Sequence, residues 1–86
     1  MLERSTIQDE VTLYIQREFL AGTGNERLDP NQSLVESGII ESIGLFLVIG
    51  FLEEHFGVKV EPEDMVVENF ETVAAIEELV QRKTRA

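Results

Sequence analysis

The strongest constraint on the fold is an uncharged stretch at residues 42–52, which is followed by two glutamates and, at position 57, by glycine. Its 11 residues are too few to cross a bilayer, because a spanning helix needs about 20. A helix over residues 42–56 has one apolar stripe at core spacing, made of Leu45, Val48, Ile49, Leu52 and Phe56. Its other side is also apolar and holds Ile43, Phe46, Leu47, Gly50 and Phe51.

A chain of 86 residues has too few other elements to bury such a helix on all sides. Part of the second apolar side is therefore expected to face solvent or a partner, as docking surfaces do. The alternative is that a long loop before this helix and a short helix after it cover Phe46 and Phe51. The sequence leaves both interpretations open.

Apolar periodicity predicts two further long helices, over residues 5–20 and 72–83, and a short one over residues 63–68 after a proline. The apolar side of the last helix holds Val73, Ile76, Leu79 and Val80. The only strand-like alternation, at Val58 and Val60, is too short to make a sheet. The sequence therefore predicts an all-α fold, an irregular four-helix bundle of three longer helices and one short helix, in a single domain over residues 1–86.

The segment between the first two helices, residues 21–41, shows no sustained period. A structureless connection of this length is uncommon in a compact domain, so it is either functional or tied down. We expect the apolar residues of the segment to tie it to the core, and these are Leu28, Leu34, Val35, Ile39 and Ile40.

The net charge of −10 is large for this length, and no Lys or Arg occurs between Arg27 and Lys59. An acidic surface of this kind disfavours nucleic acid and anionic membranes as partners. It favours basic patches on other proteins, although acids kept only for solubility explain the charge equally well. Like charge also favours a monomer, and the absence of an apolar leader at the N-terminus leads us to expect a cytoplasmic protein.

Catalytic and metal chemistry find little support in the sequence. Cysteine is absent, so thiolate zinc sites and cysteine nucleophiles are excluded. A serine hydrolase at Ser42 would need a nearby base, but the only histidine, His55, lies about 20 Å farther along the same helix. We interpret His55 as a solvated residue near a helix end. The calcium-loop spacing that starts at Asp29 lacks the required glycine and final glutamate. We therefore expect no catalytic residue and no metal site.

The stretch at residues 33–45, Ser-Leu-Val-Glu-Ser-Gly-Ile-Ile-Glu-Ser-Ile-Gly-Leu, resembles the attachment motif of the acyl carrier protein family. In that family an Asp-Ser-Leu triplet follows a leucine-containing loop and a glycine. The family's Leu-Glu-Glu-x-Phe-Gly helix ending is matched at residues 52–57, and its Phe-x-Thr-Val opening of the last helix at residues 70–73. These pieces cover about residues 33–80 in the expected order.

The resemblance implies a free-standing acyl or peptidyl carrier protein in which Ser42 bears 4′-phosphopantetheine. A serine at a helix start also suits a plain N-cap, and the two roles are compatible. The implied partners are a phosphopantetheinyl transferase, an adenylate-forming ligase or acyltransferase, and downstream acyl-accepting or condensing enzymes. We expect these partners to contact Glu41, Ile43, Phe46, Leu47, Glu53 and Glu54, with the acids guiding encounter and the apolar groups holding the complex.

The positions at which this chain departs from the family pattern help to indicate the kind of pathway in which such a carrier would act. Glu41 and Ile43 replace the family's aspartate and leucine on either side of the serine. Fatty-acid carriers usually have acids two and five residues after the serine, where this chain has Gly44 and Leu47. The sequence therefore favours an aminoacyl or acyl carrier of a dedicated or secondary-metabolic pathway. A carrier of primary fatty-acid or polyketide synthesis and a non-carrier acidic interaction module are the alternatives.

Overall fold

The computed structural model describes residues 4–22, 28–40 and 42–85, with side chains for residues 6–22, 28–40 and 43–84. The first helix consists of α1 (Arg4–Ile15) and a continuing π-helical turn, η1 (Gln16–Leu20). It is followed by α2 (Ser42–Phe56), the 3₁₀ turn η2 (Pro62–Asp64), α3 (Val67–Phe70) and α4 (Val73–Arg85). No strand occurs in these described ranges, and the predicted all-α fold of three longer helices and one short helix is confirmed.

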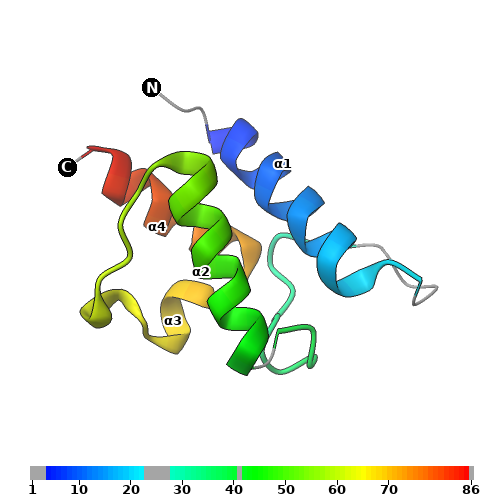
Figure 1. The fold of residues 1–86 in the computed structure, drawn as a ribbon. Helices are drawn as coiled ribbons and strands as arrows, with labels where there is room; N and C mark the ends of the chain where they lie inside the picture. Colours follow the sequence, from blue (N-terminus) through cyan, green and yellow to red (C-terminus); the bar gives the residue numbers. More distant parts are fainter. Residues whose placement is uncertain (1–3, 23–27, 41, 86) are drawn as a thin grey trace.

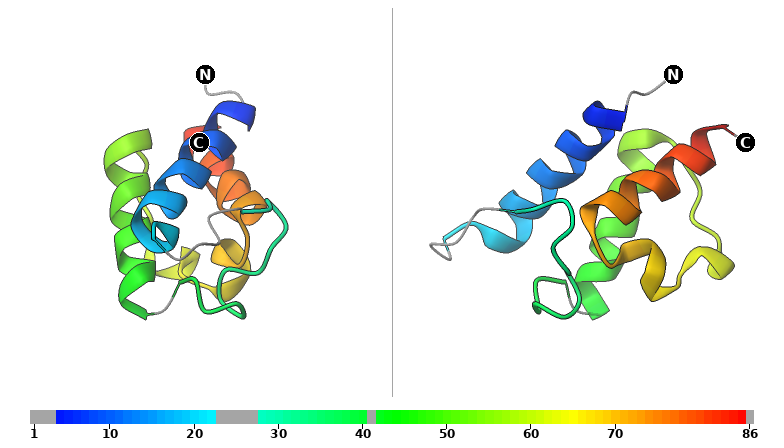
Figure 2. Two further views of the ribbon diagram at one scale, coloured as in Figure 1. Left: turned by 90° about the vertical axis from the view of Figure 1, so that its right-hand side faces the viewer. Right: turned by 180° about the vertical axis from the view of Figure 1, so that it is seen from behind.

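The three longer helices pack around one core, and α3 closes one end of it (Figures 1 and 2). Helices α1 and α4 run in opposite directions, so that α1 begins and α4 ends at the same end of the bundle. The buried apolar side chains are Ile7, Val11, Ile15, Leu20, Leu28, Leu34, Ile40, Val48, Ile49, Leu52, Val60, Phe70, Val73, Ile76, Leu79 and Val80. Within the described part of the chain, no helix is both long enough and apolar enough to cross a membrane.

The loop before α2 is held by its backbone as well as by its apolar side chains. Leu34 donates its N–H to the carbonyl of Glu71 at 2.7 Å, and Ala74 donates to the carbonyl of Pro30 at 3.0 Å. Leu28, Leu34 and Ile40 are buried, and Ile39 packs against the core. Val35 was expected to join them, but its side chain is 41% exposed. The loop is therefore tied to the start of α4, which lies next to it in space.

The short helix predicted over residues 63–68 is instead split into η2 and α3. Pro62 opens the 3₁₀ turn, and the side chains of Glu61 and Asp64 cap each other's backbone N–H groups across it. Met65 then takes non-helical backbone angles, φ −85° and ψ 64°, so the helix cannot continue through it. The turn that buries Phe70 begins afresh at Val67.

Two contacts hold this η2–α3 segment against the end of α4. Lys83 forms an ion pair with Asp64, whose Oδ2 also accepts the N–H of Glu61 at 2.9 Å. Arg82 donates to Asn69 Oδ1 at 2.9 Å. The hydrogen bond from the Lys83 side chain, assisted by the Glu61 N–H and by the charges of Lys83 and Arg82, lowers the pKa of Asp64 below 3.8. The basic last turns of α4 therefore position α3.

Two glycines in α2 have opposite surroundings. A Cβ on Gly44 would lie 2.8 Å from Cε1 of Phe19, so the absence of a side chain lets η1 pack against the first turn of α2. A Cβ on Gly50 would meet nothing within 4 Å. Only the first of these glycines is needed for packing.

The matched changes Gly44→Ala and Gly50→Ala test this difference. Overpacking against Phe19 costs more than the gain in helix propensity, so Gly44→Ala should lower the free energy of unfolding by about 1–2 kcal/mol. Gly50→Ala should raise it by about 0.5–1 kcal/mol, because only the propensity gain applies. Urea unfolding measures both. Equal stability of the two variants would contradict the tight contact at Gly44.

Replacing Asp64 by Asn tests the contacts that hold α3. A lowered folded-state pKa stabilises the fold above the unfolded value, and this contribution is lost as pH falls through the lowered pKa. Asp64→Asn should therefore be less stable than wild type at neutral pH, and the difference should shrink as pH falls below 3.8 and vanish once pH is below the lowered pKa. Denaturant unfolding across this pH range measures it. The neighbouring exposed carboxylate provides the control, since Glu63→Gln should change stability by less than about 0.5 kcal/mol. A difference for Asp64→Asn that persists in acid would argue against the ion pair.

Candidate functional site

Ser42 is the first residue of α2. The backbone N–H groups of a first helical turn lack intrahelical acceptors, and the positive end of the helix dipole lies there. The first turn of α2 contains no acidic residue that would repel an anion. This end of the helix therefore suits a phosphodiester. Glu41 and the Ser42 side chain lie outside the described residues.

The outer side of α2 is apolar and exposed, as the first of the two sequence interpretations expected. The exposed fractions are 76% for Ile43, 67% for Phe46 and 49% for Leu47. These side chains and the exposed Glu54 are the part of the expected partner-binding set that faces solvent freely. Glu53 is also exposed, but its Oε2 accepts the N–H of Val60 at 2.9 Å, which ties the following segment to α2.

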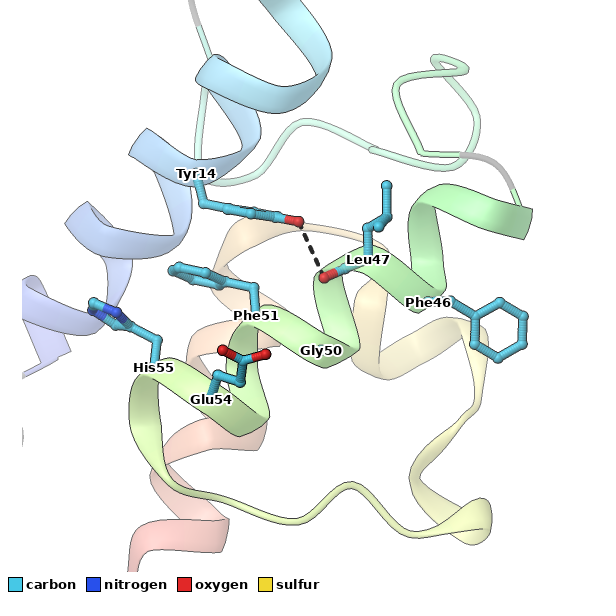
Figure 3. Close-up of a pocket in the computed structure, with 7 residues that line it drawn as sticks. All are labelled: Tyr14, Phe46, Leu47, Gly50, Phe51, Glu54 and His55. Atoms are coloured by element: carbon cyan, nitrogen blue, oxygen red, sulfur yellow. Dashed lines mark hydrogen bonds between the residues drawn. The ribbon is translucent and has the colours of Figure 1, made fainter.

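Phe51 is partly buried, and the element that packs on it is α1 rather than the loop or the short helix. Its ring stacks on Tyr14 with centroids 4.1 Å apart and on His55 with centroids 4.9 Å apart (Figure 3). The Tyr14 hydroxyl donates to the Leu47 carbonyl at 3.1 Å. Burial, and secondarily the charge of Glu18, raise the pKa of Tyr14. We call Tyr14, Phe51 and His55 the aromatic column.

His55 is exposed near the end of α2, as the sequence suggested, and it also has a partner. Its Nε2 lies 3.1 Å from Oε1 of Glu10 in α1, and its side chain is 44% exposed. The histidine thus joins α1 to α2, and it lies 13 residues, or about 20 Å, from Ser42 along the helix. Among the described residues, no group of three or more His, Cys, Asp or Glu is arranged to hold a metal ion.

A groove of about 490 Å³ has the aromatic column as one of its walls. Gly50 leaves a gap in it between Phe46, which points away from the column, and Glu54 (Figure 3). The groove is lined by Tyr14, Phe46, Leu47, Gly50, Phe51, Glu54 and His55. The sequence did not reveal it, because the walls come from two helices that are distant in the chain.

A second pocket of about 420 Å³ lies between α2, the preceding loop and the η2–α3 segment. All of its lining side chains are apolar, and they belong to Val35, Ile40, Leu45, Met65, Val66, Val67 and Phe70. Met65, Val66 and Val67 are exposed at its rim. The exposure of Val35 noted above is explained by its place at this pocket. Helix α2 is therefore flanked by one groove that carries a carboxylate and one pocket that does not.

Comparison with known proteins adds independent evidence. The sequence matches the family described as "Phosphopantetheine attachment site" over residues 20–80, which include α2, α3 and most of α4. Two similar proteins are the D-alanyl carrier proteins of Lactococcus lactis subsp. cremoris strains MG1363 and SK11. Each is 34% identical to this chain over 67 residues, which cover 78% of this chain and 85% of the relative.

Proposed function

The chain belongs to the family of proteins with a phosphopantetheine attachment site, and we propose that Ser42 is the residue to which the phosphopantetheine arm is attached. The protein is a carrier protein, and its covalent cofactor is 4′-phosphopantetheine. The observation that supports Ser42 is its position as the first residue of α2, inside the matched region and at the serine of the attachment motif.

The arm explains how a chain without cysteine takes part in thioester chemistry, because the reactive thiol belongs to the cofactor. Carrier proteins in general are loaded by other enzymes: a phosphopantetheinyl transferase attaches the arm, and ligases or acyltransferases add the cargo. We infer that this chain catalyses no step itself. Its histidine is distant from Ser42 along α2 and is paired with Glu10.

Attachment at Ser42 is tested by intact mass. Apo protein incubated with coenzyme A and a broad-specificity phosphopantetheinyl transferase should gain the mass of one arm. Ser42→Ala should gain none, while Ser37→Ala, which changes a serine in the preceding loop, should behave like wild type. A gain that persists in Ser42→Ala would move the attachment site elsewhere.

We propose that the cargo is an aminoacyl group in a dedicated pathway. The relatives named D-alanyl carrier proteins support an aminoacyl cargo. The positions that are acidic in fatty-acid carriers are Gly44, where Phe19 leaves no room for a side chain, and Leu47. An adenylate-forming ligase is accordingly the proposed loading enzyme. The single domain over residues 1–86, the monomeric state and the cytoplasmic location stay predictions.

The proposed docking face consists of Ile43, Phe46, Leu47 and the acids Glu41, Glu53 and Glu54. Its three apolar side chains are exposed next to the start of α2, so a partner that covers them also reaches the arm. Apolar groups rimmed by acids suit a basic, partly apolar partner surface, in which the charges speed encounter and the apolar contacts hold the complex.

Leu47→Glu tests this face, with Leu13→Glu as the matched control. Leu47 and Leu13 are leucines of similar exposure, 49% and 52%, on α2 and α1 respectively. A glutamate at position 47 places an uncompensated charge in the proposed interface, so the kcat/KM for loading by the cognate ligase should fall at least about 10-fold. Leu13→Glu should leave loading unchanged. Equal loading of both variants would exclude Leu47 from the interface.

A further inference from the structure

Gly50 is a feature that the fold itself does not explain. A glycine inside a helix lowers helix stability. Gly44 is required by Phe19, but no neighbour and no left-handed backbone angle requires glycine at position 50. What the missing side chain provides is the gap in the groove between Phe46, Leu47, Phe51 and Glu54 (Figure 3). An occupant of this gap would account for the glycine.

The gap lies in line with the proposed attachment residue. Ser42, Phe46, Gly50 and Glu54 follow one another at intervals of four residues, so they form one oblique row on α2 that turns by about 40° at each step. Glu54 is about 18 Å from Ser42 along the helix axis. From the serine Cα to the amine of an aminoacyl thioester there are about 19 bonds, which matches roughly six extended residues or about 20 Å. A loaded arm that follows this row therefore passes Phe46 and Gly50 and ends near Glu54.

The charges of the groove favour a cationic end group. Glu54 is exposed, and it has no ion pair or hydrogen bond to another described side chain. The neighbouring His55 faces Glu10 at 3.1 Å instead. The side chains that line the pocket on the other side of α2 are all apolar, so an ammonium group placed there would lose hydration without gaining a carboxylate.

We propose that the groove over Gly50 binds the aminoacyl end of the arm, with the ammonium group at the Glu54 carboxylate. This inference rests on the proposed attachment at Ser42 and on the aminoacyl class of cargo. The groove then distinguishes cargo by charge: an aminoacyl group is retained there, and an uncharged acyl group of the same size is not. Because Phe46, Leu47 and Glu54 also belong to the docking face, an enzyme that docks on this face displaces the cargo from the groove.

The experiment compares two ¹⁵N-labelled forms of the protein by NMR. A broad-specificity transferase attaches either the arm bearing alanine or the arm bearing isobutyrate, both through an amide in place of the thioester so that the cargo is not hydrolysed. Isobutyrate has a methyl group where alanine has its ammonium group. The amide signals of Leu47, Gly50, Phe51 and Glu54 should shift in the alanyl form and much less in the isobutyryl form. The shifts should shrink as salt is added, since the charge pair is exposed.

Three variants make the test specific. Glu54→Gln should abolish the difference between the two forms, whereas Glu63→Gln, on η2 and outside the groove, should retain it. Gly50→Leu fills the gap and should abolish the alanyl response while the remaining signals show an intact fold. Identical spectra for the two cargoes, or shifts centred on Met65, Val66 and Val67, would overturn the groove assignment. Absence of the arm itself, seen by mass, would instead overturn the proposed function along with it.

Discussion

Burial of α2 is the constraint that organises this fold. The helix has no charge over residues 42–52, so it is stable in water only if its neighbours remove much of its surface from solvent. One side, with Val48, Ile49 and Leu52, is buried in the core that α2 shares with α1 and α4. The next side is covered by α1 through Tyr14 of the aromatic column and by η1 through Phe19 at Gly44. None of the described elements covers the outer side, and Ile43, Phe46 and Leu47 stay exposed beside the attachment motif.

Periodicity predicted the parts of the fold that depend on local sequence. The bounds of α2 agree with the prediction over residues 42–56, because Ser42 opens the helix and Gly57, at φ +69°, ends it. The last helix was also expected with the correct apolar side. The split of the short helix at Met65 was missed, since it depends on capping between Glu61 and Asp64 and on contacts with α4. The contacts with α4, such as that between Arg82 and Asn69, join residues that are distant in the chain.

For the candidate site, too, the sequence indicated only the features that depend on local sequence. The attachment motif was identified by its resemblance to a known family, whereas the exposed side chains on α2 follow from helical spacing and from the small number of elements in the chain. The aromatic column does not, because nothing local pairs Tyr14 with Phe51 across 37 positions. The different roles of the two glycines of α2 could not be predicted from local sequence either. They look alike in the sequence, and only the position of Phe19 distinguishes the glycine that packing requires from the one that leaves a gap.

The groove and the pocket that flank α2 give a physical basis for distinguishing a charged cargo from an apolar one. For the proposed arm at Ser42, the choice between them depends on what the end of the arm gains or loses in each. An apolar chain gains by leaving water for the pocket lined by Leu45, Met65 and Phe70. An ammonium group would lose hydration in that pocket, but beside Glu54 it stays solvated and gains a carboxylate. An exposed pair of this kind is worth about 1 kcal/mol or less, which is enough to shift a tethered group several-fold toward the groove and weak enough for a docking enzyme to displace it.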